Sequence, residues 1–237
     1  MVTTLYLVRH GETEGSGAKR YLGSIDVPLS EKGIHQIKDA SAFIREDLKT
    51  LGAAQHSSYL KEIDRAPHAD KQSGVEEGTL QAVYSSDLSR AMKSGQIVAE
   101  PYALRVTVIP ELRERSFGIW EGMTFSEIKE TYPAEFESWA SNPLKYSPPG
   151  GEGTMEVHER VIRALDMILS KHKGENIAIV AHGGVNRIIL CHLLGIPLEN
   201  IFRIEQNHGA VNIVEFWENY PVVKLMNRMV HIEKIKS

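Results

Sequence analysis

The chain has 237 residues, of which 42% are hydrophobic, and it carries a formal net charge of −4 at pH 7. That length suits one compact domain with a substantial core, so we expect a single domain over residues 1–237. The basic residues are scattered, which argues against binding of nucleic acid or of an anionic membrane and leaves small molecules as the expected partners.

The sequence gives no sign of secretion or of a membrane span. Cys191 is the only cysteine, so an internal disulfide is excluded. No apolar run approaches the roughly 20 residues that a helix needs to cross a bilayer. The first residues, MVTTLYLVRH, lack the basic start and the long apolar stretch of a secretory signal. We therefore expect a soluble cytoplasmic protein, of an oligomeric state that the sequence does not specify.

The first half of the chain combines regular elements with one irregular segment. Residues 3–8 are β-branched and apolar, which is typical of a strand buried on both faces. Ser30 can cap a helix that runs to about Leu48, because apolar residues recur there at helical spacing. From about residue 49 to 78 the sequence is polar and mixed in charge, and it is too long for an ordinary connection. We expect a lid or a mobile insertion in that segment.

Strands and helices alternate again after the irregular segment. The expected strands lie at 80–84, 104–109, 176–181, 211–217 and 222–226, the last two joined by a turn at 218–221. The expected helices lie at about 87–100, 155–172 and 185–194. Thr124 and Glu127 have capping-box spacing, and Pro133 suits the first turn of a further helix. This βαβ order predicts a mostly parallel sheet.

Polar and charged side chains follow three of the expected strands. The first strand ends in RHG at residues 9–11, the second leads into a helix that carries Arg90, and the strand NIAIVA ends in HGG at residues 182–184. The carboxyl ends of parallel strands share one rim of an open sheet, and ligands bind at that rim. Two histidines and two arginines are therefore expected to converge there.

This combination favours a site for phosphoryl transfer. Arg9 and Arg90 can hold a phosphoryl group by forked hydrogen bonds, and backbone amides of the glycine turns add donors. A neutral imidazole can attack phosphorus directly, and His10 is the candidate because the following glycine lets a ligand approach closely. His182 would hold a phosphoryl oxygen and stabilise charge during the transfer.

A leaving alkoxide also needs a proton donor. The stretch PELRERSFGIWEG contains three candidates, Glu111, Glu114 and Glu121. Glu114 is favoured by its position, because it follows the third strand near the same rim. All three remain open on position alone, since any of them can be a solvated surface charge. RHG or HGG by itself would more often be a simple turn, and only their joint occurrence favours function. The other histidines are expected to be packing or surface residues, namely His35, His158, His192 and His208.

At this point the sequence resembles the histidine phosphatase superfamily, in the branch named for the cofactor-dependent phosphoglycerate mutases. The motifs LVRHGET, YLGSIDVPLSEKG, YSSDLSRA, PELRERSFGIWEG, PPGGEG and VAHGGVNRII occur in the family's order. The resemblance implies a three-layer α/β/α sandwich with a mostly parallel central sheet. It also implies a phosphoryl transfer without a metal or a cofactor.

The resemblance assigns roles residue by residue. It implies that His10 is the phosphorylated nucleophile and Glu114 the proton donor. The phosphate pocket it implies consists of Arg9, Arg90 and His182, with Thr13, Gly23 and Gly183 lining it. Where the family commonly has an asparagine after RHG, this chain has Ser16, a shorter donor.

The activity within the family is less closely defined. Related mutases carry a basic insert after the proton-donor segment, whereas here residues 123–153 are more acidic than basic, as in the phosphatases. The ending IFRIEQNHGAVNIVEF followed by VVKLMN looks most like α-ribazole phosphatases, so α-ribazole-5′-phosphate is one expected substrate. The alternatives are a broad-specificity phosphatase, a phosphoglycerate mutase and a phosphoester-binding module without turnover. A two-metal hydrolase is disfavoured, because the aspartate-rich ligand set for hard metal ions is lacking.

Overall fold

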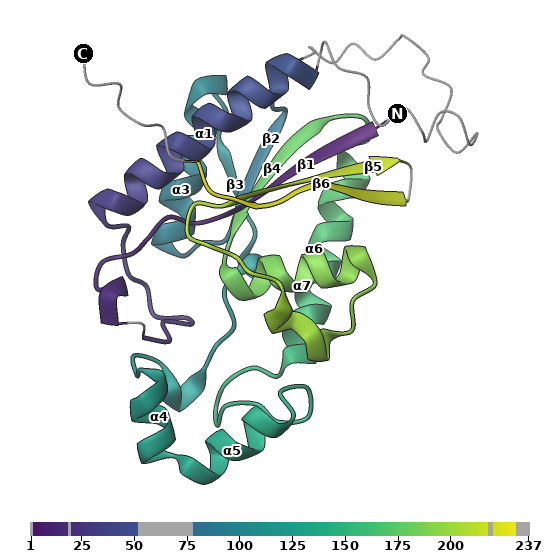
Figure 1. Ribbon diagram of the computed structural model, residues 1–237. Helices are drawn as coiled ribbons and strands as arrows, with labels where there is room; N and C mark the ends of the chain where they lie inside the picture. The colour runs from purple at the N-terminus through teal and green to yellow at the C-terminus, as the bar shows by residue number, and fades with distance from the viewer. Residues whose placement is uncertain (1, 19, 52–77, 218–219, 231–237) are drawn as a thin grey trace.

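The computed structural model describes residues 2–18, 20–51, 78–217 and 220–230, and these form one six-stranded sheet with helices on both faces (Figure 1). The strands are β1 (Val2–Arg9), β2 (Ala82–Ser85), β3 (Val106–Val108), β4 (Asn176–Ala181), β5 (Val211–Trp217) and β6 (Tyr220–Arg228). Their order in the sheet is β3-β2-β4-β1-β5-β6. The pairs among β1 to β4 are parallel, and β5 runs antiparallel to both β1 and β6. The expected mostly parallel sheet is confirmed.

The α-helices are α1 (Glu31–Leu51), α3 (Ser89–Ala99), α4 (Phe125–Thr131), α5 (Pro133–Ser141), α6 (Thr154–Lys171) and α7 (Gly183–Leu194). The short 3-10 helices are η1 (Ser16–Ala18), η2 (Glu100–Tyr102), η3 (Pro110–Leu112), η4 (Gly118–Trp120) and η5 (Leu198–Arg203). None of the helices in the described ranges is long and apolar enough to cross a bilayer.

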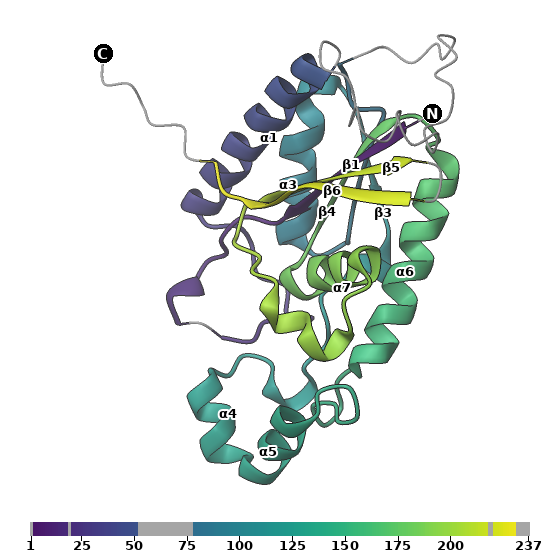
Figure 2. The ribbon, with the colours of Figure 1, turned by 45° about the vertical axis from the view of Figure 1, so that its right-hand side comes forward.

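Two cores flank the sheet and make it the middle of three layers. In β1, Leu5 and Leu7 belong to the core shared with α6 and α7, whereas Tyr6 and Val8 belong to the core shared with α1 and α3. Figure 2 shows the two pairs of helices on opposite faces of the sheet. Because successive strand residues point to opposite faces, both faces of β1 must be apolar, and this is the pattern of residues 3–8.

Capping interactions fix where two of the helices begin. The Ser30 hydroxyl accepts a hydrogen bond from the backbone N–H of Gly33 at 3.0 Å, at the start of α1. Thr124 and Glu127 form both bonds of a capping box at the start of α4, at 3.3 Å and 2.7 Å. Both predicted caps are confirmed.

Several predicted boundaries are wrong by a few residues. The helix expected at 87–100 is α-helical only over Ser89–Ala99 and tightens into η2, where Pro101 lacks an N–H. The strand expected at 104–109 forms ladder bonds only over Val106–Val108. The last strand begins at Tyr220, before the predicted 222, and Pro221 is tolerated there because β6 is an edge strand.

The predicted insertion can be located only in part. Residues 49–51 continue α1 past its expected end at Leu48, and residue 78 begins the approach to β2. Residues 52–77, which carry the rest of the predicted lid or insertion, lie outside the described residues.

A separate unit, residues 118–141, is here called the helical cap. It comprises η4, α4 and α5, and four buried side chains, Trp120, Ile128, Phe136 and Trp139, give it a small core of its own. In both ribbon views the cap lies beyond the carboxyl ends of the parallel strands (Figures 1 and 2). It therefore faces the rim where the sequence placed the site.

Candidate active site

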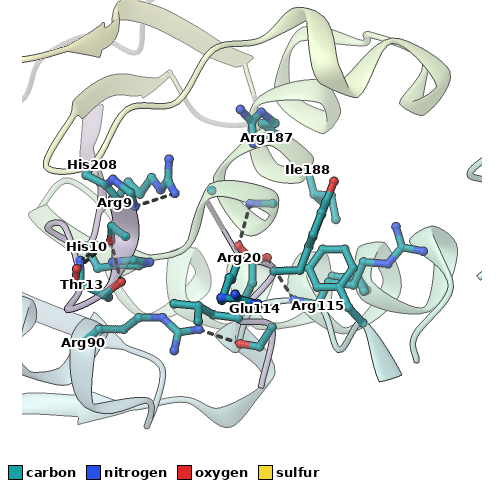
Figure 3. Close-up of a pocket in the computed structure, with 18 of the residues that line it drawn as sticks. Arg9, His10, Thr13, Arg20, Arg90, Glu114, Arg115, Arg187, Ile188 and His208 are labelled. Carbon is teal, nitrogen blue, oxygen red and sulfur yellow. Dashed lines mark hydrogen bonds between the residues drawn. The ribbon is translucent and has the colours of Figure 1, made fainter. Parts of the chain in front are cut away.

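A cavity of about 490 Å³ opens at the rim of the sheet below the helical cap. Its wall includes most of the predicted site residues, namely Arg9, His10, Thr13, Ser16, Gly23, Arg90, Glu114 and Gly183. Figure 3 shows Arg9, His10 and Arg90 on one side of the cavity and Glu114 with Arg115 on the other. The convergence expected from the strand ends is therefore found in the structure.

His10 is held in one tautomer at the end of β1. Its Nδ1 lies 2.7 Å from the carbonyl oxygen of Gly11, and because a carbonyl can only accept, Nδ1 carries the hydrogen. Nε2 then keeps its lone pair. Burial, with His182 and Arg9 nearby, holds the pKa of His10 well below its ordinary value. The ring is therefore neutral, which is the form of an imidazole that acts as a nucleophile.

Arg9 is anchored by the turn that precedes β5. One terminal nitrogen donates to the carbonyl of Gln206 at 2.5 Å, and the other donates to Nε2 of His208 at 2.8 Å. The Nε of Arg9 is buried and has no partner within the protein. Burial, with Arg187 close by, lowers the pKa of Arg9 to about 10, so the guanidinium remains charged at neutral pH.

His208 corrects the expectation that it is a packing or surface residue. It lines the cavity, accepts from Arg9, and its ring centroid lies 5.4 Å from that of His10. Burial and the charge of Arg9 lower the pKa of His208 to about 3, which keeps it a neutral acceptor. The next residue, Gly209, holds His208 beside the end of β1, because the Gly209 N–H donates to the carbonyls of Arg9 and His10, both at 3.1 Å.

Arg90 enters the cavity from the first turn of α3. Its two terminal nitrogens donate to the carbonyls of Ile25 and Gly23, each at 2.7 Å, and the side chain is almost wholly buried. Gly23 has a left-handed backbone with φ of 51°, and a Cβ at this position would lie 2.3 Å from a carboxylate oxygen of Glu121. Glycine is therefore required where the loop that holds Arg90 packs on Glu121.

His182 lies behind His10 and is fully buried, and it is absent from the cavity wall. The two rings pack edge to face with centroids 5.1 Å apart. Nε2 of His182 lies 2.7 Å from the hydroxyl of Ser86, while Nδ1 is buried without a partner in the protein. Burial and the charges of Arg90 and Arg9 hold the pKa of His182 well below its ordinary value.

Glu114 is the glutamate that reaches the cavity. Its carboxylate accepts from the backbone N–H groups of Arg115 and Gly184, both at 3.0 Å, the second in the first turn of α7. The other two candidates differ from it. Glu111 is exposed, and Glu121 accepts hydrogen bonds from the Ser24 backbone and hydroxyl outside the cavity wall. Of the three candidates, Glu114 is therefore the one that lines the cavity, and its role as proton donor stays a prediction.

Thr13 and Ser16 line the cavity but are hydrogen-bonded to each other. The Ser16 hydroxyl donates its only hydrogen to the Thr13 carbonyl at 2.7 Å and accepts from the Thr13 N–H at 3.0 Å. A direct bond from Ser16 to a phosphate would need that hydrogen to turn away, so this role stays a prediction. Gly183 packs against Arg9, since a Cβ on it would lie 3.2 Å from the guanidinium carbon.

The predicted set lacks several residues of the cavity wall. Besides His208, it lacks three arginines, Arg20, Arg115 and Arg187, and an apolar group that includes Tyr21, Phe117, Trp139, Ile188 and Phe202. His208 had a signal in the sequence, because it is the third histidine followed directly by glycine. The arginines and the apolar group had none, because their elements converge only in the folded chain.

Comparison with known proteins agrees with the fold and identifies the family. The family model described as Histidine phosphatase superfamily (branch 1) matches residues 5–76 and 72–229. Phosphoserine phosphatase 1 from Hydrogenobacter thermophilus is 28% identical over 96% of this chain and 93% of its own length. Adenosylcobalamin/alpha-ribazole phosphatase from Salmonella typhimurium is 27% identical over 94% of this chain and 95% of its own.

Solved structures show the same architecture. Bacillus stearothermophilus YhfR has a TM-score of 0.74 and 30% identity, covering 98% of this chain and all of the other. The alpha-ribazole phosphatase from Shigella flexneri has a TM-score of 0.75 at 23% identity, covering 97% of this chain and 99% of its own, and this likeness concerns the fold. The chain belongs to the histidine phosphatase superfamily. It is a phosphatase.

Proposed function

We propose that this phosphatase hydrolyses small-molecule phosphate monoesters through a phosphohistidine at His10, with no metal or cofactor. The observation that carries the proposal is the tautomer of His10. With Nδ1–H donated to Gly11, the lone pair is on Nε2, between the cationic side chains of Arg9 and Arg90. A neutral nucleophile between two guanidinium groups suits attack on a phosphoryl dianion.

The first step forms a bond between Nε2 of His10 and phosphorus and breaks the bond from phosphorus to the ester oxygen. A proton passes from the Glu114 carboxyl group to that oxygen, so the product leaves as an alcohol. The hydrogen bond from Nδ1 to Gly11 stabilises the positive charge that the ring acquires.

The second step returns the enzyme to its starting state. Water attacks phosphorus, the bond to Nε2 breaks, and Glu114 takes the proton from the water. Arg9 and Arg90 hold the phosphoryl oxygens in both steps. The bond from His182 to a third oxygen stays a prediction, because His182 lies behind the His10 ring and outside the cavity wall.

Two substrates follow from the relatives. The names of the relatives point to α-ribazole-5′-phosphate and to phosphoserine, and both relatives match nearly the whole chain. We propose α-ribazole-5′-phosphate as the first to assay, since a cavity of about 490 Å³ is far larger than serine needs. A phosphatase of broad specificity is the alternative, and the same assays separate it from an enzyme with one preferred ester.

The deciding experiment is capture of the phosphoenzyme. In excess EDTA, the purified protein is mixed with α-ribazole-5′-phosphate, phosphoserine, 3-phosphoglycerate and a panel of sugar and nucleotide monophosphates, and it is quenched rapidly. We expect an acid-labile phosphoryl group on His10 and release of inorganic phosphate, both absent in His10→Ala. Failure to form a phosphoenzyme with any ester would refute the proposal, and bisphosphate-primed isomerisation of 3-phosphoglycerate would favour a mutase.

The role of Glu114 has its own test. Glu114→Gln is expected to lower kcat on alkyl phosphates by about 100-fold or more, within the usual range for loss of a general acid. The loss on 4-nitrophenyl phosphate should be much smaller, because nitrophenolate leaves without a proton. Glu111→Gln, on the exposed glutamate of the same segment, is the control. Equal losses on both esters would remove Glu114 from the acid role.

A further inference from the structure

One side of the cavity is formed by aromatic rings that the proposed chemistry does not use. Trp139 comes from α5 in the helical cap and Phe202 from η5, and both line the cavity. Their ring centroids are 6.3 Å apart and their planes meet at 72°. Tyr21 and Phe117, which also line the cavity, form a second edge-to-face pair at 4.8 Å.

The two rings differ in how they are held. Trp139 is 8% exposed and packs edge to face against Trp120 at 5.6 Å, so the cap core fixes its position. Phe202 is 63% exposed, the largest exposed fraction among the exposed large apolar side chains in the described residues. An aromatic side chain with that much open surface at a cavity wall offers a face on which a flat group of the ligand can stack.

Two further arginines of the wall are anchored by contacts with the protein. Arg20 donates to the Gly122 carbonyl at 2.6 Å and pairs with Glu127 at 2.8 Å. Arg187 donates through Nε to the Ile204 carbonyl at 2.7 Å. These contacts hold both guanidinium groups at the wall.

Besides Nε of Arg9 at the phosphoryl end, two N–H donors on the described cavity-lining residues are buried without a partner in the protein. They are Nη2 of Arg115 and Nε1 of Trp139, and both atoms are buried. A buried donor without an acceptor is unfavourable, so each suits an acceptor on the ligand, such as a hydroxyl oxygen or a ring nitrogen. The wall thus offers aromatic surface together with isolated donors.

We propose that Phe202, packed on Trp139, determines specificity by stacking on a flat heterocycle, and that the substrate class is a phosphate monoester whose alcohol carries such a ring. This inference rests on the proposed function, and it extends that function from the phosphoryl group to the alcohol. An amino acid phosphate or a simple sugar phosphate would leave the aromatic side of the cavity without a partner.

The test compares esters that share one leaving group. Ribose 5-phosphate, adenosine 5′-monophosphate and α-ribazole-5′-phosphate are all esters of the ribose 5′-hydroxyl, so the reacting group is the same and the esters differ in the ring at C1′ and in its configuration. The measured quantity is kcat/KM for each ringed ester divided by kcat/KM for ribose 5-phosphate. We expect the better of the two ringed esters to exceed ribose 5-phosphate at least about 10-fold in the wild type.

Phe202→Ala should lower that ratio by about 3- to 10-fold, which is the usual contribution of an aromatic pair. Phe202→Trp should keep the ratio. Phe125→Ala is the matched control, because Phe125 is also exposed and also packs edge to face on a buried ring, Phe136 at 4.8 Å, but lies outside the cavity wall.

The outcomes separate the two levels of the proposal. Hydrolysis of all three esters with ratios near one, or a ratio that Phe202→Ala leaves unchanged, overturns the stacking role while the phosphatase mechanism stands. Absence of hydrolysis and of a phosphoenzyme with every ester overturns the proposed function and this inference with it. A ratio that falls equally in Phe125→Ala would show that the loss is not specific to the cavity.

Discussion

Glu121 connects the two parts of the site that hold the phosphoryl group and donate the proton. Its carboxylate accepts from the Ser24 N–H at 2.9 Å, in the loop whose carbonyls hold Arg90. It also accepts from the Phe117 N–H at 3.0 Å, three residues after Glu114. Burial opposes its charge, but the hydrogen bonds from Ser24 and Phe117 hold the pKa of Glu121 below its ordinary value.

Glu121→Gln should therefore weaken phosphate binding, although Glu121 itself does not contact the phosphate. The NH₂ group of the glutamine side chain cannot accept a hydrogen bond, so the side chain loses part of the bonding to Ser24 that the carboxylate makes. The loop that positions Arg90 is then held less firmly. We expect KM and the inhibition constant of inorganic phosphate to rise by about 10-fold, as for the loss of a hydrogen bond to a charged group, with a smaller change in kcat. Glu111→Gln is the matched control. A lower melting temperature with unchanged phosphate inhibition would reduce Glu121 to a purely structural residue.

The residues that could be predicted from sequence are those that carry chemistry in a recognisable local pattern. Arg9 and His10 directly follow a strand that is apolar on both faces, so their place at the rim followed from the pattern alone. His208 could not be placed in this way. His208 reaches the site because β5 runs antiparallel to β1 and pairs Val211 with Val8. The direction of that pairing cannot be read from the sequence of either strand.

At the scale of elements, α1 packs closely against the turn after β1, and this contact fixes the backbone next to His10. A Cβ on Gly33, in the first turn of α1, would lie 1.9 Å from the carbonyl oxygen of Glu12, and one on Gly11 would lie 2.2 Å from the carbonyl oxygen of Gly33. Neither glycine has a positive φ, so both are required for space alone.

Gly33→Ala should destabilise the protein although alanine is the better helix former. The gain of about 1 kcal/mol in helix propensity is outweighed, because the methyl group must push the backbone of Glu12 away. We expect a net loss of about 2 kcal/mol in the free energy of unfolding by urea, together with lower activity because His10 shifts. Gly17→Ala is the control, since no heavy atom lies within 4 Å of its Cβ. Equal stability of the two variants would contradict this account.

The helical cap was not predicted to be part of the site, and the way in which it packs explains why. The capping box at Thr124 and the proline at 133 correctly predicted two helices. Their packing depends on a core of widely spaced aromatic residues, Trp120, Phe136 and Trp139, which is too small to give a periodic signal. The position of Trp139 in the cavity wall therefore follows from tertiary packing, and the sequence suggested a lid only at residues 49–78.

At the scale of the whole molecule, the site concentrates positive charge inside a protein whose net charge is −4. Arg9 and Arg90 are both largely buried, and the histidines beside them avoid further repulsion by remaining neutral. The site is thus complementary to a dianion, and it disfavours protonation of His10, His182 and His208.

This arrangement predicts a loss of stability in mild acid. The folded-state pKa of His10 and of His182 lies well below the unfolded value of about 6.5, and that of His208 is about 3. Below about pH 6.5 the unfolded chain binds protons that the folded protein does not, so stability falls as the pH drops from about 6.5 toward 3. Carboxylates with lowered pKa, such as Glu121, contribute only below about pH 5.

Between pH 7.5 and 5.5 each neutral imidazole should cost about 1.4 kcal/mol, so the free energy of unfolding should fall by about 4 kcal/mol in total, measured by urea titration at both pH values. His208→Gln keeps an acceptor for Arg9 and should reduce that difference by about one third. His35→Gln, on an exposed histidine, should leave it unchanged. A wild-type protein equally stable at both pH values would mean that the histidines at the site take up protons in the folded state, and the neutral nucleophile assigned to His10 would have to be abandoned.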